Sequence, residues 1–441
     1  MNKSSLHRAV KILLQREQVR TVEEGYELLR TFAVGVRISE EDCANAVSQT
    51  ALATFVNVAH RVFLGGVFVE LPSRDFPCIS PLFVLPTLGP ALEELGAVIS
   101  EIPASAPTLL IGDLSPSKRP EVKAYFSGWS GGIAPSGEES ETDSKALSLT
   151  GVLSASLAAS EMFRFYSGET SRFGQGRVGI SLLDPATPWD DPVACKSVFA
   201  PDALWLLGLG HLGQAYAWSL ASIPFADQKP LLVLQDTGLI EDANLSTSVL
   251  TFDGDLGRLK TRTVAGWLEA RGFHTRITER LFTGDSSPQV GEPRILLGGV
   301  DNLEARQALE DPGFDLVVDA GLSPLGKSYD WLTIKTFTGT GRARTVFSEP
   351  TRGTEVSALE IEAYRALGLD ECGVNELAGV AVGVPFVGLV ASTLVLSEVI
   401  RALHGKALTT SMAGRVHVLN EVERVTGSPL ETNPGFLEVR L

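Results

Sequence analysis

The sequence predicts an α/β protein in which a mostly parallel, Rossmann-like sheet occurs twice along 441 residues. Three observations predict this fold. In the second half, apolar strand patterns alternate with helical patterns, as in a parallel sheet. A Gly-rich turn, LGLGHLG at 207–213, joins one such strand to a helix. A stretch of the first half also recurs in the second half.

The recurring stretch is GVLSASLAASEMFRFYSG at 151–168, which matches GLVASTLVLSEVIRALHG at 388–405. Each copy reads as a buried helix with small residues for close packing and a glycine at its end. Gly-Arg-Val follows both copies, at 176–178 and 414–416, and is expected to begin a strand. The identical positions are Gly151 and Gly388, Leu157 and Leu394, Ser160 and Ser397, Glu161 and Glu398, Arg164 and Arg401, and Gly168 and Gly405.

These patterns divide the chain into three parts. Residues 1–48 read as a helical extension, with a capped helix starting at Thr21. Residues 49–190 read as a degenerate copy of the fold, because they lack an intact G-x-G-x-x-G. Residues 191–441 read as the complete copy, with apolar strands at ALWLLGLG, PLLVLQD, RILLGGVD and DLVVDAG.

Charge and composition argue against several partners. The net charge of -16 argues against nucleic acid, whose phosphates require a basic surface. Residues 377–397 are uncharged and long enough to span a membrane, but Gly and Pro interrupt them and the repeat predicts a core helix. The four cysteines form no C-x-x-C pair, and the amino terminus lacks a signal peptide, so we expect a cytoplasmic protein.

The Gly-rich turn predicts a nucleotide-phosphate site. Gly208 lets the chain turn, Gly210 lets the backbone approach a phosphate, and Gly213 lets the helix pack on the sheet. The amides at the start of the helix favour an anion there. Asp236, at the end of the next strand, can accept hydrogen bonds from ribose hydroxyls. These features alone fit NAD and ATP equally well.

An ordered series of polar residues separates the two readings. Asn244 lies in NLSTSVLTF, Lys260 lies in GDLGRLKTRTV, and Asp301 and Asn302 lie in GGVDNLEARQAL. Hydride transfer has no use for this series. Adenylyl transfer instead requires a cation at the α-phosphate, a magnesium ligand and polar groups around the leaving pyrophosphate.

The stretch 206–309 resembles the adenylating domain shared by ubiquitin-activating enzymes and ThiF/MoeB-type proteins, and the tandem halves resemble compact activating enzymes of bacterial ubiquitin-like conjugation operons. The resemblance implies that ATP and Mg²⁺ bind here. Asp236 would bind ribose, and Asp301 would hold Mg²⁺. Asn244, Lys260 and Asn302 would lie along the nucleotide, with Lys260 also acting on the phosphates during catalysis.

One position departs from the family pattern. Thr247 stands where the family's Asn-Leu-x-Arg motif has arginine, so a cation expected near the phosphates is missing. Losing a preorganised charge can slow a reaction on the order of a hundredfold. The arginines that we consider as replacements are Arg258, Arg262, Arg306 and, from the other half, Arg37 and Arg61.

Cys372, in GLDECGVNELAG, is the expected nucleophile. The resemblance implies that its connection crosses the active site and that the thiol takes the activated carboxyl group as a thioester. Asp370 and Glu371 disfavour the thiolate, whereas a helix beginning near Val374 would favour it. A buried structural cysteine is the alternative.

The sequence therefore predicts ATP-dependent activation of a ubiquitin-like protein, followed by thioester transfer from Cys372 to a conjugating enzyme. Three alternatives remain. They are a MoeB-like activator of a sulfur-carrier protein that stops at the adenylate, an NAD-binding oxidoreductase, and a scaffold that binds ATP without turnover. The halves can pair within one chain, or the protein can form a homodimer.

Overall fold

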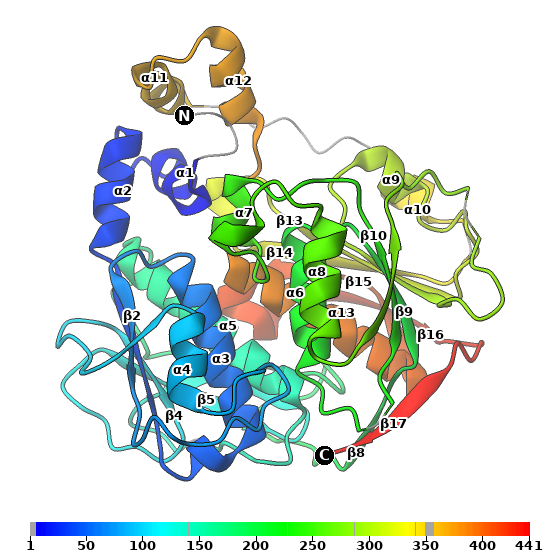
Figure 1. The fold of residues 1–441 in the computed structure, drawn as a ribbon, viewed down its shortest axis with the longest axis horizontal. Coiled ribbons are helices and arrows are strands. Elements are labelled where there is room, and N and C mark those ends of the chain that lie inside the picture. The colour runs from blue at the N-terminus through cyan, green and yellow to red at the C-terminus, as the bar shows by residue number, and fades with distance from the viewer. Residues whose placement is uncertain (1–5, 140, 227, 286, 340, 349–356) are drawn as a thin grey trace.

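The computed structural model describes residues 6–441 except 140, 227, 286, 340 and 349–356. The described residues form two large sheets with helices between them, and a short two-stranded sheet (Figure 1). Each large sheet is mostly parallel. The expected α/β fold with two Rossmann-like sheets is confirmed.

The first sheet has the strand order β3-β2-β1-β4-β5-β6-β7. Its strands are β1 (Ala33–Ile38), β2 (Gly66–Glu70), β3 (Ala97–Ile99), β4 (Thr108–Ile111), β5 (Glu121–Ser127), β6 (Ser130–Pro135) and β7 (Val178–Ser181). The helices of this half are η1 (Asp42–Ala44), α3 (Ala46–His60), α4 (Leu88–Glu94) and α5 (Ser148–Tyr166).

The second sheet has the order β11-β10-β9-β12-β13-β14-β15-β16. Its strands are β9 (Ala203–Leu207), β10 (Leu231–Gln235), β11 (His274–Thr278), β12 (Ile295–Gly298), β13 (Leu316–Leu322), β14 (Trp331–Phe337), β15 (Ala407–Arg415) and β16 (Glu423–Pro429). Its helices are α6 (His211–Ala221), α7 (Asp242–Thr247), η2 (Asp253–Asp255), α8 (Lys260–Glu269), α9 (Leu303–Gln307), η3 (Gly326–Ser328), α10 (Ala343–Val346), α13 (Pro385–Leu403) and η4 (Val416–Glu421). Strands β8 (Ser197–Pro201) and β17 (Phe436–Arg440) pair separately.

The two large sheets repeat one topology. Strands β3-β2-β1-β4-β5-β6-β7 match β11-β10-β9-β12-β13-β14-β15 in order. The repeated stretches form α5 and α13, which pack on each other, on α3 and α6, and on their own sheets. Buried apolar side chains of both halves form one continuous core. The halves are therefore structural duplicates joined through their helices.

The repeated glycine has a packing role in both halves. A Cβ on Gly151 would lie 2.8 Å from the carbonyl oxygen of Val47 in α3. A Cβ on Gly388 would collide with the imidazole of His211 in α6. The glycine therefore allows α5 to pack closely on α3 in the first half, and α13 to pack closely on α6 in the second half.

Two sequence expectations, one about each half, are wrong. The helical extension does not reach residue 48, because β1 and the start of α3 belong to the first sheet. Gly-Arg-Val begins a strand only at 176–178, whereas at 414–416 it ends β15 and enters η4. The tripeptides are therefore not structurally equivalent.

Helix α13 explains the uncharged stretch. In the described residues, α13 is the helix long and apolar enough to cross a membrane, and 94% of its most apolar window is buried inside the protein. It packs on α5, α6 and the second sheet. Its composition is that of the central core helix that the repeat predicts.

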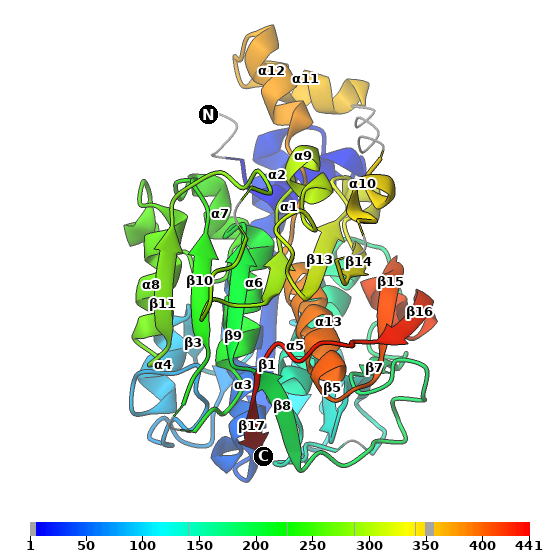
Figure 2. The same cartoon turned by 90° about the vertical axis from the view of Figure 1, so that its right-hand side faces the viewer.

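Four helices lie outside the duplicated core. They are α1 (Arg8–Gln15), α2 (Val22–Arg30), α11 (Ala358–Ala366) and α12 (Glu371–Gly379). Helix α2 starts at Thr21 as expected, with Thr21 Oγ1 accepting from the amide of Glu24. Figures 1 and 2 show α11 and α12 as a hairpin above α1, beyond the end of the second sheet where α7 and α9 lie.

Candidate functional site

The Gly-rich turn has the geometry of a phosphate loop. Gly208 has φ +80°, which other residues rarely adopt, and its amide bonds the carbonyl of Gln235 at 2.9 Å. A Cβ on Gly213 would collide with the carbonyl oxygen of Gly208. A Cβ on Gly210 would meet only Lys260 Nζ, at 4.0 Å. The turn is thus closed toward the sheet and open toward Lys260.

Asp236 holds this turn in place. Its Oδ2 accepts from the amide of Leu209 at 2.6 Å, and its Oδ1 accepts from the amide of Gly238 at 2.6 Å. The amide of Lys260 bonds the carbonyl of Gly238 at 3.0 Å, so α8 starts beside the same loop. The structure therefore brings together the Gly-rich turn, Asp236 and Lys260, which are distant in sequence.

Asp301 and Asn302 lie at the same edge of the sheet. Strand β12 pairs with β9, and a Cβ on Gly208 would meet Gly299 and Val300, the residues just before Asp301. Asp301 is exposed, and its carboxylate has no hydrogen bond or ion pair among the described residues. Asn302 caps α9 through the amide of Ala305, so part of its role is structural.

Asn244 and Thr247 serve α7 in this structure. Asn244 Oδ1 accepts from the amide of Glu241, which closes a capping box. Thr247 is buried and its hydroxyl donates to the carbonyl of Ala243. A Cβ on Gly383 would lie 3.0 Å from His211 Nδ1 and 3.5 Å from Thr247 Cγ2. The linker between α12 and α13 therefore runs against the Gly-rich turn and α7.

Arg61 cannot replace the missing cation in this arrangement. Its guanidinium is buried and donates to the carbonyls of Leu245, Val249 and Thr251 and to Asn57 Oδ1. Burial lowers the pKa of Arg61 to about 9. The side chain fixes the segment after α7 onto the first half, which is a structural role.

Three other candidates are also engaged. They form ion pairs at or near the surface: Arg37 with Glu70 and Glu121, Arg258 with Asp255, and Arg262 with Glu279. Strand β1, which carries Arg37, belongs to the first sheet. Arg306 is the remaining cation of those we considered.

Arg306 lies beside Asp319, a buried carboxylate of β13 that pairs with Gly298 at the end of β12. Its Nη2 donates to the carbonyl of Ala320 at 2.7 Å and lies 3.4 Å from Asp319 Oδ2, while its Nε is buried without a partner in the described residues. A Cβ on Gly298 would lie 2.6 Å from Asp319 Oδ1. Burial raises the pKa of Asp319 to about 7, against the opposing effect of Arg306.

Cys372 is exposed, unlike Cys43 and Cys195. It lies in the first turn of α12, which begins at Glu371 rather than near Val374. Asp370 caps this helix by accepting from the amide of Gly373 at 2.8 Å. The thiol is therefore at the amino end of a helix, in a hairpin whose linker contacts the Gly-rich turn.

Comparison with known proteins assigns the chain to a family. The model described as the BilD C-terminal domain matches residues 200–406, and that described as the BilD N-terminal domain matches residues 33–182. A protein of Collimonas sp. (strain OK412), named bacterial E1-like protein BilD, is 36% identical over 439 residues, with 96% of this chain and 94% of that protein covered. The chain belongs to the BilD family.

The BilD N-terminal match begins at β1, in agreement with the corrected boundary of the first half. Solved structures to which this chain is similar include E. coli MccB with ATP, at 13% identity and TM-score 0.34, covering 70% of this chain and 95% of that one. PaaA has 14% identity and TM-score 0.33, covering 52% and 72%. At these TM-scores, neither likeness bears on the fold or the reaction of this chain.

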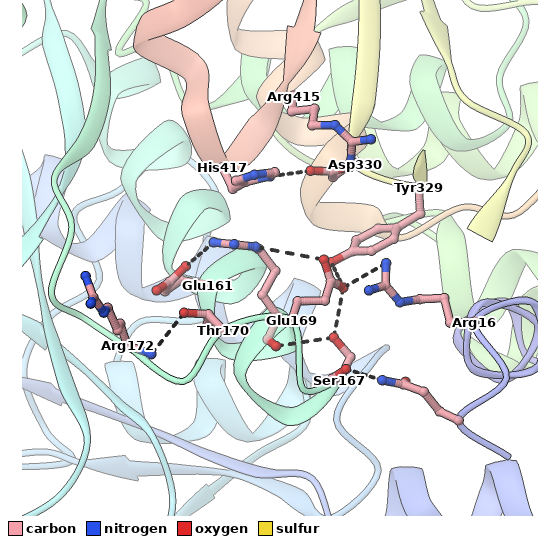
Figure 3. Close-up of polar contacts among 12 residues, drawn as sticks. Arg16, Glu161, Ser167, Glu169, Thr170, Arg172, Tyr329, Asp330, Arg415 and His417 are labelled. Atoms are coloured by element: carbon pink, nitrogen blue, oxygen red, sulfur yellow. Dashed lines mark hydrogen bonds and ion pairs between the residues drawn. The ribbon is translucent and has the colours of Figure 1, made fainter. Parts of the chain in front are cut away.

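Sequence reasoning missed a His-Asp pair in this BilD-family chain. His417 Nδ1 lies 2.5 Å from buried Asp330 Oδ2, and Arg415 donates to the other oxygen (Figure 3). Burial opposes ionisation of Asp330, but the bonds from His417 and Arg415 prevail and lower its pKa. The pair lies near Glu161 and Tyr329, where the halves meet. The only local signal was the second Gly-Arg-Val, which contains Arg415.

Proposed function

We propose that this protein activates a ubiquitin-like protein by ATP-dependent adenylation of its terminal carboxylate and then forms a thioester on Cys372. The observation that carries the proposal is the joint placement of the Gly-rich turn, Asp236 and Lys260, with Asp301 at the same sheet edge. The 36% identical relative named E1-like supports the reaction class.

In the first step, the carboxylate oxygen of the partner's last residue attacks the α-phosphorus of ATP, and the bond to pyrophosphate breaks. The amides at the start of α6 and Lys260 Nζ would stabilise the charge that develops on the phosphates. Asp236 would accept hydrogen bonds from the ribose hydroxyls, while the amides of Leu209 and Gly238 hold its carboxylate in place. Asn244 and Asn302 accept the capping bonds through Oδ1, and their Nδ2 amides would donate to the nucleotide.

The residues present fit one magnesium contact. Asp301 is an exposed carboxylate without a partner in the described residues, as an oxygen ligand for Mg²⁺ must be. No group of three His, Cys, Asp or Glu side chains that could hold a metal occurs in the described chain. Asp301 would therefore share Mg²⁺ with phosphate oxygens, where the ion supplies positive charge.

In the second step, the Cys372 thiolate attacks the acyl carbon of the adenylate, and AMP leaves with the electron pair of the broken C–O bond. The proton lost from the thiol passes to solvent, to which Cys372 is exposed. The thioester would then transfer to the cysteine of a conjugating enzyme by the same exchange of acyl acceptor.

ATP-pyrophosphate exchange in the presence of the ubiquitin-like partner tests the first step. We expect exchange in the wild type and none in Asp301→Ala, with Asp113→Ala, an exposed carboxylate after β4 in the first half, as the matched control. Exchange at the wild-type level in Asp301→Ala would refute the magnesium assignment.

Cys372→Ala separates the two steps. We expect this variant to keep exchange and to lose the thiol-sensitive adduct on gels, with Cys78→Ala, a half-buried cysteine of the first half, as the control. An adduct that persists in Cys372→Ala means that the cysteine is structural and that the protein stops at the adenylate. Binding of NADH in place of ATP would instead support an oxidoreductase.

A further inference from the structure

Helix α1 contacts the hairpin that carries Cys372 through a buried polar network. Lys11 Nζ donates to the carbonyls of Leu377 and Ala378, at 2.7 and 2.8 Å, and lies 3.4 Å from Glu360 Oε1. The Lys11 side chain is 0% exposed and that of Glu360 is 1% exposed. Tyr364 donates its hydroxyl to Glu360 at 2.9 Å. One lysine therefore joins α1 to both helices of the hairpin.

Gln15 extends the network into the second half. Its Nε2 donates to both oxygens of Glu360 at 3.2 Å, and its Oε1 accepts from the amide of Gly326 at 2.5 Å. Buried carboxylates are costly unless they are paired and hydrogen-bonded, and Glu360 has both kinds of partner. The network thus fixes α11 relative to the loop after β13.

The segment after α1 is attached to the first half at a residue that also contacts the second half. Arg16 pairs with Glu169 at 3.4 Å, and Tyr329 donates to Glu169 at 3.0 Å (Figure 3). Gln18 donates to the carbonyl of Ser167. Because Tyr329 belongs to the second half and Glu169 to the first, this segment sits where the halves join. Helix α1, which lies below the hairpin, is therefore held in place by contacts on both sides.

Among the described residues, Lys11 reaches α12 only at the last turn of that helix. Leu377 and Ala378 are in its last turn, where a cation also complements the helix dipole. Cys372 is in the first turn, about 8 Å away along the axis at about 1.5 Å per residue. The linker is held too, because the amide of Val382 bonds the carbonyl of Pro324 at 3.1 Å. Lys11 therefore fixes the base of the hairpin and leaves the thiol end open.

We propose that Lys11 and Glu360 are positioning residues for the thioester step, which hold the base of the Cys372 hairpin so that the thiol can meet the acyl-adenylate. The inference rests on the proposed function, because it needs Cys372 to be the acyl acceptor. It also gives a role to α1, which precedes the duplicated fold. Neither residue touches the nucleotide loop in the structure, so adenylation does not depend on them.

The test compares the two steps in full-length Lys11→Met and Glu360→Gln. Glu360→Gln keeps the shape of the side chain, removes the charge opposite Lys11 and replaces one acceptor oxygen by a donor amide. Glu362→Gln is the matched control, because Glu362 is an exposed carboxylate of the same helix, α11. We measure ATP-pyrophosphate exchange, single-turnover thioester formation with the ubiquitin-like partner, and amide hydrogen exchange of residues 358–379.

We expect exchange within twofold of wild type in all three proteins. Thioester formation should be at least tenfold slower in Lys11→Met and Glu360→Gln, with faster hydrogen exchange in the hairpin, and unchanged in Glu362→Gln. Wild-type thioester rates in both variants overturn the inference, as does an equal loss of both steps, which would show a general structural role. A wild-type protein that exchanges pyrophosphate but forms no thioester overturns the proposed function, and the inference with it.

Discussion

The turns that follow the first strand of each half differ in whether a side chain occupies them. After β9, the turn from Gly208 to Gly213 leaves backbone amides open beside Lys260. After β1, the matching turn contains Asp42, whose oxygens accept from Ser39 Oγ at 2.6 Å and Ser48 Oγ at 2.5 Å. A Cβ on Gly112, at the end of β4, would collide with this carboxylate.

The difference shows how one copy of a duplicated fold can lose a phosphate site and keep its shape. The start of a helix favours an anion. In the first half Asp42 supplies that negative charge, whereas in the second half the place is open to a ligand. A phosphate beside Asp42 would face a like charge and a filled space. The first half can therefore serve as scaffold while the second half carries the proposed nucleotide site.

The largest expected effect comes from closing the open turn. In Gly213→Ala, the new methyl group meets the carbonyl of Gly208, so the turn must shift and the amides no longer converge on the phosphates. We expect ATP-pyrophosphate exchange to fall at least a hundredfold. Gly266→Ala in α8, where a Cβ meets nothing within 4 Å, is the control and should retain exchange. Equal activity of the two variants would contradict the phosphate-loop assignment.

The next effect concerns a carboxylate beside the open site. Strand β13 places Asp319 next to Gly298 at the end of β12, whereas β5 carries Ala124 just beyond its pairing with β4. Burial raises the pKa of Asp319 from 3.8 to about 7. The folded protein then holds a proton that the unfolded chain releases, so this contribution to stability is present below pH 4 and is lost as the pH rises through 7.

Asp319→Asn should remove this dependence. Between pH 5 and pH 8, the free energy of unfolding of the wild type should fall relative to the variant by on the order of 3 kcal/mol. Urea unfolding of both proteins at the two pH values measures the difference. A constant difference would mean that Arg306, 3.4 Å away, keeps Asp319 ionised throughout.

The duplicated fold and the open turn of the second half could be predicted from the sequence, because local residue patterns mark both. The repeat glycines Gly151 and Gly388 marked the duplicated helices, and a strand before a Gly-rich turn marked the open site. Strand β1 was missed because AVGVRI is short and follows two helical patterns. Its sheet partners lie elsewhere in the chain, so only tertiary pairing identifies it.

The site was predictable to the extent that its residues follow strands. Gly208, Asp236 and Asp301 each come at the end of a parallel strand, and such ends meet at one edge of the sheet. The capping role of Asn244 and the exact start of α12 could not be read, since helix boundaries are poorly marked in sequence. The contact of Lys11 with Glu360 joins opposite ends of the chain and has no local signal.

A smaller effect is expected from emptying the filled turn of the first half. Asp42→Ala leaves the hydroxyls of Ser39 and Ser48 without their buried acceptor, which should lower the free energy of unfolding by about 2 kcal/mol. Exchange should remain at the wild-type level, because the proposed nucleotide site lies in the second half. Denaturant unfolding and exchange assays together check this. A loss of exchange in a stable variant would show that the first half contributes to the site.

The smallest effect compares two asparagines that cap helices in the two halves. Asn45 caps α3 by accepting from the amides of Val47 and Ser48, and Asn302 caps α9 by accepting from the amide of Ala305. Asn45→Ala should cost about 1 kcal/mol of stability and leave exchange intact. Asn302→Ala removes a single capping bond, so it should cost no more stability, yet it should slow exchange because Asn302 adjoins Asp301. Equal exchange in the two variants would restrict Asn302 to capping.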